Sequence, residues 1–396
     1  MTATVAGPAS APAPVARHLI ALSLLPGVGP ATVLACHVQP GGAQAAWDAV
    51  VAGRPSRVAG LAPAMARLGG GGVASVVAAA RSLDPELELR RHLALGRHVL
   101  VSGHPGYPER LAQDPSPPAV LFAAGHLGCL AGPTVAIVGT RNATRPGREF
   151  AAELGADLAA AGVAVVSGLA LGIDGAGHHG ALRVDNGSGR PVGVVASGLD
   201  IAYPRRHAEL HARVARSGLL LSETPLGQRP VAWRFPARNR IIAGLSDAVV
   251  VVESRSAGGS MLTVAEALDR GVPVLAVPGH PSAPAAAGTN DLLFDGAAIV
   301  RSVADVFDAI GMTSVPPVCP DPGREAVSQP PAHRSVLAAM DQTPAALSEI
   351  VARSGLPLDV VSEALVHLEA EQSVVRTAGW YERATPVGEH RTGGRP

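Results

Sequence analysis

The segment Phe235–Ser246 reads FPARNRIIAGLS and leads into the apolar run Ala248–Val252. Its isoleucines and leucine are spaced as on one face of a helix, and the β-branched run is typical of a buried strand. Three polar residues lie at the predicted helix start, after Pro236: Arg238, Asn239 and Arg240. A helix N-terminus offers free backbone N–H groups and the positive end of the helix dipole. The segment therefore predicts an anion-binding helix beside a central strand of an α/β sheet.

The same alternation of strand and helix patterns extends to both sides of this segment. Strand-like runs occur at 135–138, 163–166, 192–195, 218–221, 248–252, 274–277 and 298–300. Helical stretches lie between most of them, at 147–161, 173–184, 205–217, 237–245, 262–270 and 303–310. This alternation predicts a Rossmann-like, doubly wound parallel sheet that binds ligands at the carboxyl ends of its strands. Short strands at 99–101 and 119–122 extend the domain, which spans 83–312.

Residues suited to ligand contact follow the predicted strands. Glycine lets a backbone approach a ligand closely, and Ser, Thr and Arg add hydrogen-bond donors. The candidates are Gly139, Thr140, Arg141, Ser167, Gly168, Gly172, Ser260 and Thr263. Between Arg205 and Arg240 the chain has eight arginines against two acids, Glu209 and Glu223, and it has no lysine anywhere. This local excess of arginine can attract phosphate groups.

Composition excludes several classes of protein. The formal net charge is zero, so the chain is not a uniformly basic nucleic-acid coat. Its three cysteines form no CxxC pair, which fits a reducing cytoplasm and indicates neither structural zinc nor a disulfide framework. Residues 1–16 are rich in Ala and Pro and lack the pattern of a signal peptide. Pro and Gly interrupt the long uncharged stretches, so no membrane helix is expected.

Smaller segments flank the central domain. Residues 1–16 are expected to be disordered and 17–82 to form a helical domain. There Leu25-Pro-Gly-Val-Gly-Pro-Ala31 separates two apolar segments. Its glycines suit either a helix–hairpin–helix contact with phosphate or a plain interhelical turn. The remaining expectations are a Pro-rich linker at 313–332, a winged helix at 333–384 and a loose tail at 385–396.

The third helix of the predicted winged helix has few groups suited to reading bases. Duplex recognition helices usually carry Arg or neutral polar base readers. This helix instead carries Glu363, His367, Glu369 and Glu371. The pattern favours a protein-contact or accessory role over sequence-specific duplex binding.

Taken together, the motifs resemble those of the DNA-processing protein A (DprA/Smf) family. They occur in the family's order and approximate spacing over residues 100–312. The matching segments are AIVGTRNATRPG (136–147), VVSGLALGIDGAGHHGAL (165–182), ASGLDIAYP (196–204), LLSETPLG (220–227), FPARNRIIAGLS (235–246), GSMLT (259–263), AVPG (276–279) and GTNDLLFDGA (288–297). Departures from the family pattern include Gly177-His178 and His207.

The resemblance implies a protein that binds single-stranded DNA, forms a homodimer and loads the RecA recombinase, with no cofactor and no known chemistry of its own. By motif position, Arg141 would bind a phosphate, and Gly139, Thr140, Ser167 and Gly168 would donate hydrogen bonds. The basic groove would be lined by Arg205 or Arg206 and by Arg238 and Arg240. The segment after Gly288 would lie near the dimer contact.

Two other functions remain compatible with the sequence. Gly258-Gly-Ser260, Thr263 and Glu266 faintly resemble the signature of nucleoside-monophosphate phosphoribohydrolases, in which a glutamate would assist glycosidic cleavage. The alternative for Glu266 is a solvated helix residue. The winged helix suggests a transcription regulator. A nicotinamide dehydrogenase is disfavoured because the first loop reads GTRNATRPG and the second strand ends in Ser167-Gly168.

Overall fold

The computed structural model describes residues 13–58, 60–184, 189–312, 330–340, 345–370, 373–377 and 380–383. The chain divides into two compact units, Met1–Val318 and Cys319–Pro396. Most of the predicted disordered start, most of the predicted linker and the whole predicted tail lie outside the described residues. Among the helices that the structure describes, none is long and apolar enough to span a membrane.

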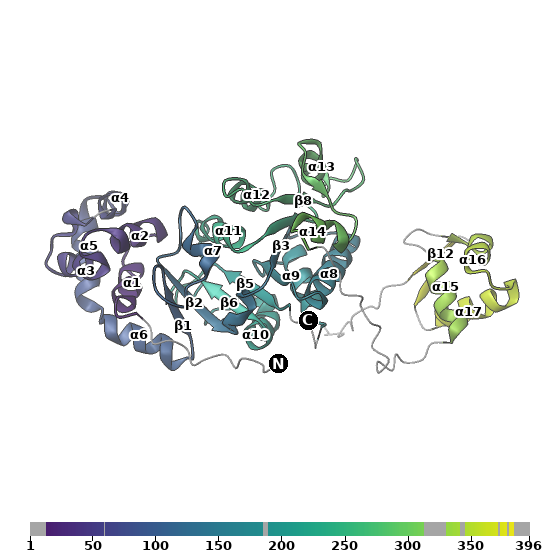
Figure 1. The fold of residues 1–396 in the computed structure, drawn as a ribbon, viewed down its shortest axis with the longest axis horizontal. Helices are drawn as coiled ribbons and strands as arrows, with labels where there is room; N and C mark the ends of the chain where they lie inside the picture. Colours follow the sequence, from purple (N-terminus) through teal and green to yellow (C-terminus); the bar gives the residue numbers. More distant parts are fainter. Residues whose placement is uncertain are drawn as a thin grey trace, which may run out of the picture. The chain divides into compact units, whose positions relative to one another are not determined.

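The first unit is built on a nine-stranded sheet of order β1-β2-β6-β5-β4-β3-β7-β8-β9 (Figure 1). The strands are β1 (His98–Val101), β2 (Val120–Gly125), β3 (Thr134–Val138), β4 (Ala164–Ser167), β5 (Pro191–Val195), β6 (Leu219–Ser222), β7 (Ala248–Val251), β8 (Val274–Ala276) and β9 (Ala298–Ile299). All neighbours from β6 to β9 are parallel, whereas β1 and β2 join antiparallel at one edge. The predicted doubly wound sheet is confirmed. Its order reverses between β3 and β7, which makes that gap the topological switch point.

Alternating residues of the strands supply two separate cores. Val135 and Ile137 of β3 face one core with the helices α8 and α9, whereas Ala136 and Val138 face the other with α11 and α12. Side chains alternate between the faces of a sheet, so a strand buried on both faces is apolar throughout. The helices of this part are α7 (Glu109–Ala112), α8 (Arg145–Ala160), α9 (Ile173–Ala181), α10 (Ala208–Ser217), α11 (Arg234–Leu245), α12 (Met261–Leu268), α13 (Ala287–Phe294) and α14 (Val303–Ala309).

Six helices form a module at the start of the first unit. They are α1 (Ala16–Ser23), α2 (Pro30–Val38), α3 (Gly42–Val51), α4 (Leu61–Arg67), α5 (Gly72–Ser82) and α6 (Pro85–Ala94). Leu19, Ile20 and Leu61 are fully buried in a core that continues into Phe122 of β2 and Val214 of α10. The helical module is therefore packed onto the sheet through a shared apolar core.

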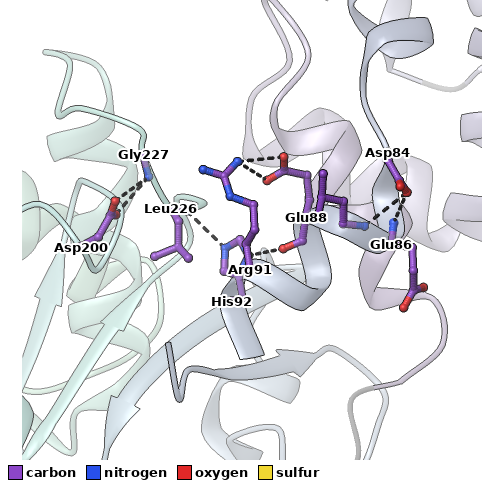
Figure 2. Close-up of polar contacts among 9 residues, drawn as sticks. Asp84, Glu86, Glu88, Arg91, His92, Asp200, Leu226 and Gly227 are labelled. Carbon is purple, nitrogen blue, oxygen red and sulfur yellow. Dashed lines mark hydrogen bonds and ion pairs between the residues drawn. The ribbon is translucent and has the colours of Figure 1, made fainter. Parts of the chain in front are cut away.

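Polar contacts of α6 fix the module to the loop that precedes α11 (Figure 2). The His92 Nδ1 donates to the carbonyl oxygen of Glu88 at 2.8 Å, and its Nε2 accepts from the amide of Leu226 at 3.2 Å. The Asp200 carboxylate accepts from the next amide, that of Gly227, at 3.0 Å. The His92 ring also stacks on Phe122, with ring centroids 4.5 Å apart. These bonds set the position of the chain as it enters α11.

Short 3-10 turns complete the first unit at η1 (Pro55–Arg57), η2 (Gly69–Gly71), η3 (Leu127–Leu130) and η4 (Arg205–His207). The second unit has the predicted winged-helix form. Its helices are α15 (Pro331–Ala339), α16 (Leu347–Ser354) and α17 (Leu358–Ala370), and its strands are β10 (Ala345–Ala346), β11 (Val374–Thr377) and β12 (Trp380–Arg383). The exposed side chains of α17 are Leu358, Asp359, Glu363, Val366 and His367. This mixture of apolar and acidic groups is unsuited to a DNA backbone, whose phosphates carry negative charge.

Candidate nucleic-acid interface

The carboxyl ends of β3 and β7 open into a cavity of about 440 Å³, here called the switch-point pocket. The loops after β3, β4 and β7 line it together with parts of α11 and α12. It brings together seven of the residues proposed from sequence: Gly139, Thr140, Arg141, Arg238, Asn239, Ser260 and Thr263. The pocket lies where the strand order reverses, which is where doubly wound sheets bind ligands.

Arg141 is the exposed cation of this pocket. Its guanidinium carbon lies 5.4 Å from the centroid of the Phe235 ring, within the range of a cation–π contact. Both residues also line a smaller adjoining cavity of about 80 Å³, together with Tyr203. The Tyr203 and Phe235 rings are 5.5 Å apart. Within the described residues no carboxylate forms an ion pair with Arg141, so its charge is available to an anionic ligand.

The structure adds a second exposed cation, Arg255, which the sequence did not single out. It follows β7 and lines the switch-point pocket together with Arg141. In the described part of the chain it too has no ion-pair partner. The sequence feature that could have identified it is its position three residues after the predicted strand that ends at Val252. The glycines at 258–259 form the more conspicuous pattern of the same loop.

Arg238 lies inside the protein rather than on an open groove. Its side chain is buried, and its Nη1 donates to the carbonyl oxygen of Gly168 at 2.8 Å and to that of Val194. The Asp174 carboxylate accepts from the amide of Gly168 at 3.1 Å. Burial raises the pKa of Asp174, and the positive charge of Arg238 opposes that rise. Burial lowers the pKa of Arg238 to about 10, so it stays protonated at neutral pH.

Asp174 and Arg238 together hold the loop after β4 in position through hydrogen bonds. The amide and the carbonyl of Gly168 are both engaged, one by Asp174 and the other by Arg238. The helix that carries Arg238 begins at Arg234, one turn earlier than predicted. The predicted placement of Arg238 and its neighbours at the helix start is therefore wrong. They lie in the second turn, where the backbone amides are already bonded within the helix.

Two glycines allow the loops after β3 and β4 to touch. A Cβ on Gly139 would lie 2.6 Å from Cγ1 of Ile173 and 2.8 Å from the carbonyl oxygen of Glu253. Gly172 has φ +79°, and a Cβ there would lie 2.3 Å from the carbonyl oxygen of Thr140. Only glycine fits the space at both positions, and at Gly172 only glycine adopts the backbone conformation readily. Their role is to shape the pocket.

The other proposed residues have different surroundings. Ser167 is fully buried, and its hydroxyl donates to the carbonyl oxygen of Ile137 at 2.6 Å. Arg240 forms a partly buried ion pair with Glu223 at 2.5 Å and does not line the switch-point pocket. Arg205 and Arg206 are exposed in η4, next to Pro204 of the smaller cavity, and line neither cavity. Of these arginines, none lines the switch-point pocket beside Arg141.

Three polar residues of the pocket are held by neighbours. The Ser260 hydroxyl donates to the Ser254 hydroxyl at 2.8 Å, and the Asn239 side-chain oxygen accepts from Nε of Arg238 at 3.3 Å. Thr263 is buried in the first turn of α12. His207, where the sequence departs from the family pattern, bonds through Nδ1 to the carbonyl oxygen of Leu169 at 3.0 Å. It therefore supports the same loop as Asp174.

The surroundings of two glutamates argue against the enzymatic alternatives. Glu253 accepts from the amide of Thr144 at 2.9 Å and so occupies the N-terminus of α8, where a dinucleotide fold would place its pyrophosphate. Glu266 is bound by Arg270 at 2.5 Å and does not line the switch-point pocket. A phosphoribohydrolase reaction in this pocket would lack the carboxylate that the hypothesis assigned to it.

The chain has well-described relatives. The family described as "DNA recombination-mediator protein A" matches residues 98–311, and "DprA winged helix domain" matches residues 320–379. Protein Smf of Synechocystis sp. is 33% identical over 331 residues, which cover 75% of this chain and 82% of that protein. DNA processing protein DprA of Bacillus subtilis is 41% identical over 205 residues, covering 52% and 68% of the two chains.

A solved structure shows the same architecture. The X-ray structure of DNA processing protein A from Streptococcus pneumoniae aligns with a TM-score of 0.58 and 28% sequence identity. The alignment covers 74% of this chain and 97% of that one. The matched family spans the whole parallel sheet and its switch-point pocket, and the winged-helix match covers α15, α16, α17, β10 and β11 of the second unit. The chain therefore belongs to the DNA recombination-mediator protein A family, whose members carry the names DprA and Smf.

Proposed function

We propose that the chain binds single-stranded DNA at the switch-point pocket and has little preference for base sequence. The observation that carries this proposal is the exposed Arg141 guanidinium lying over Phe235, with Arg255 lining the same pocket. Strand binding without sequence preference uses a basic groove that follows the backbone and aromatic rings that stack on bases. Among the described residues that line the pocket, the only acidic one is the buried Asp174, which lies close to Arg238.

An unpaired strand suits this pocket better than a duplex. Base stacking on Phe235 or Tyr203 requires a base face that is already free, which a paired duplex does not offer. The arginines offer charge to phosphates, which positions a strand without reading its bases. Membership in a family of DNA recombination mediators agrees with this chemistry.

Fluorescence anisotropy tests the proposal, with labelled single-stranded and duplex DNA of one sequence across a salt series. Wild type should prefer the single strand, and Arg141→Ala should weaken binding. Removal of one phosphate contact should reduce the salt slope by about 0.7 on a single strand. Arg145→Ala is the matched control, because Arg145 lies four residues away but is paired with Glu149 at 2.8 Å. Absence of single-strand binding, or equal behaviour of the two variants, refutes the proposal.

The proposed homodimer would form at the β9 edge of the sheet. Four large apolar side chains are exposed on α12, α13 and β9: Leu262, Leu268, Phe294 and Ile299. Phe294 is 92% exposed, which is costly unless a partner covers it. A second copy of the chain is the partner that the family resemblance implies. Light scattering should find a dimer for wild type and a monomer for Phe294→Glu; a monomeric wild type would contradict the assignment.

We further propose that the bound strand is delivered to RecA. Family membership supports this step, because a recombination mediator acts between a DNA strand and a recombinase. The test measures RecA filament assembly on single-stranded DNA with and without the protein. Wild type should accelerate assembly, whereas Arg141→Ala should not. Equal assembly rates with wild type and with no added protein would refute this role.

A further inference from the structure

A second and larger cavity lies beside the start of α11, on the side away from the switch-point pocket. It has a volume of about 1060 Å³ and is here called the hairpin pocket. One wall is the loop between α1 and α2, which includes the Leu25–Ala31 turn noted in the sequence. The other wall is the chain from Gln228 to Arg240, with Arg67 of α4 at the rim. The function proposed above makes no use of this cavity.

The lining of the hairpin pocket is basic. Among the described residues, its lining includes three arginines and no acidic residue. One of them, Arg240, is neutralised by its ion pair with Glu223. Arg67 is exposed and donates to the carbonyl oxygen of Gly27 at 3.1 Å, while Arg234 donates to that of Arg229 at 2.7 Å. These carbonyl contacts leave two positive charges uncompensated at the pocket.

An aromatic ring is exposed beside these charges. Trp233 is 50% exposed and lines the hairpin pocket, although a tryptophan is normally buried for most of its surface. The guanidinium carbon of Arg234 lies 5.3 Å from the ring centroid. The Trp233 ring, with the Arg234 cation beside it, offers a stacking surface to a base. Phe235 and Arg141 offer the same kind of surface on the other side of the helix start.

Smaller cavities border the start of α11 between the two sides. A narrow cavity of about 40 Å³ shares Trp233 and Arg234 with the hairpin pocket. The same narrow cavity shares Val195 and Arg238 with the small cavity that contains Phe235 and Tyr203. Phe235 and Trp233, two residues apart in sequence, thus line cavities on either side of the start of α11.

Two hydrogen bonds fix the loop that leads to Trp233, one to the helical module and one to Asp200. Figure 2 shows the amide of Leu226 bonded to His92 of the helical module and the amide of Gly227 bonded to Asp200. Gln228, the next residue, already lines the hairpin pocket. The opening between module and sheet is thus held by hydrogen bonds, and a ligand entering it would not have to order the wall.

We propose that the hairpin pocket is a second contact for the same DNA single strand, in which Trp233 stacks on a base and Arg67 and Arg234 bind phosphates. This inference rests on the proposed function of the switch-point pocket. The occupant is a single strand because stacking on Trp233 needs an unpaired base face. Within the described part of the chain, the amides of Gly27 and Gly29 in the facing loop donate no hydrogen bond, so they can donate to a phosphate.

The test compares oligonucleotides of two lengths, roughly 5 and 20 nucleotides, which bracket the usual site sizes of single-strand binding folds. Anisotropy should show that Trp233→Ala weakens binding of the long strand by roughly 5- to 100-fold and leaves the short strand unchanged. Arg67→Gln should lower the salt slope for the long strand by about 0.7. Arg57→Gln, an exposed arginine of the same module outside the pocket, should change neither.

The outcomes separate this inference from the proposed function. If Arg141→Ala weakens both strands while Trp233→Ala and Arg67→Gln weaken neither, the hairpin pocket is not a DNA contact and the switch-point pocket still is. If wild type binds neither strand, the proposed function itself fails. A direct measurement uses tryptophan fluorescence: the quenching by the long strand should disappear in Trp233→Phe. Equal quenching in wild type and Trp233→Phe would overturn the stacking at this residue.

Discussion

The substitution Arg238→Met tests whether the buried pair Arg238 and Asp174 fixes the shape of the loop after β4. It removes the guanidinium that binds the carbonyls of Gly168 and Val194 and that compensates the buried Asp174 carboxylate. Removing one partner of a buried charge pair costs about 3–5 kcal/mol of unfolding free energy, because the other charge stays desolvated and unpaired. We expect a loss of this size, followed by urea unfolding with circular dichroism detection.

A double-mutant cycle with Asp174→Asn identifies the cause. Both residues bind the same residue, Gly168, through its carbonyl and its amide. The double variant should therefore be less destabilised than the sum of the two single variants, by about 1–3 kcal/mol. Arg145→Met is the control: its pair with Glu149 is exposed, and its loss should cost below about 0.5 kcal/mol.

The pH dependence of Arg238→Met provides a further check. Burial raises the pKa of Asp174, and loss of the Arg238 charge should raise it more. A carboxyl whose folded pKa exceeds its unfolded value binds more protons in the folded state, so stability increases as the pH falls from the folded pKa toward the unfolded pKa. The destabilisation should therefore shrink at lower pH.

An additive double variant, or a single-variant loss under about 1 kcal/mol, would refute the coupling of these charges.

Three other predictions concern backbone strain, histidine burial and the second pocket arginine. Gly172→Ala should cost at least about 2 kcal/mol and weaken DNA binding, because its Cβ would contact the Thr140 carbonyl; Gly271→Ala, also at positive φ but in open space, should cost only about 1 kcal/mol. Burial lowers the pKa of His178 to about 3, so only the unfolded state binds a proton on this histidine as the pH falls below its ordinary pKa. Between about pH 7.5 and 5.5, urea unfolding should therefore show a loss of about 1.4 kcal/mol in the free energy of unfolding, and the His178→Met variant should lack this loss. Arg255→Ala should lower the salt slope of single-strand binding by about 0.7 in anisotropy measurements, whereas Arg301→Ala, outside the pocket, should leave the slope unchanged.

Local patterns were enough to predict the fold. The β-branched runs at 135–138 and 248–252 became β3 and β7, and the helical spacing of Ile241, Ile242 and Leu245 became the buried face of α11. Strand exits with glycine predicted the ligand-binding edge, and Arg141 lies there in the structure. Such signals are carried by neighbouring residues, so they can be recognised without knowing what the segment packs against.

Only the tertiary structure decided which arginines are exposed at the switch-point pocket. Arg238 and Arg240 stand two residues apart in one motif, yet one bonds to the carbonyls of two strand ends and the other to Glu223, while Arg255 from a separate loop reaches the pocket. The sequence alone also gave no sign that Trp233 is exposed beside the helical module. The sequence determined that these residues are basic or aromatic and which elements carry them. Whether a charge is buried, paired or open depends on partners far away in the chain, and folding alone brings those partners together.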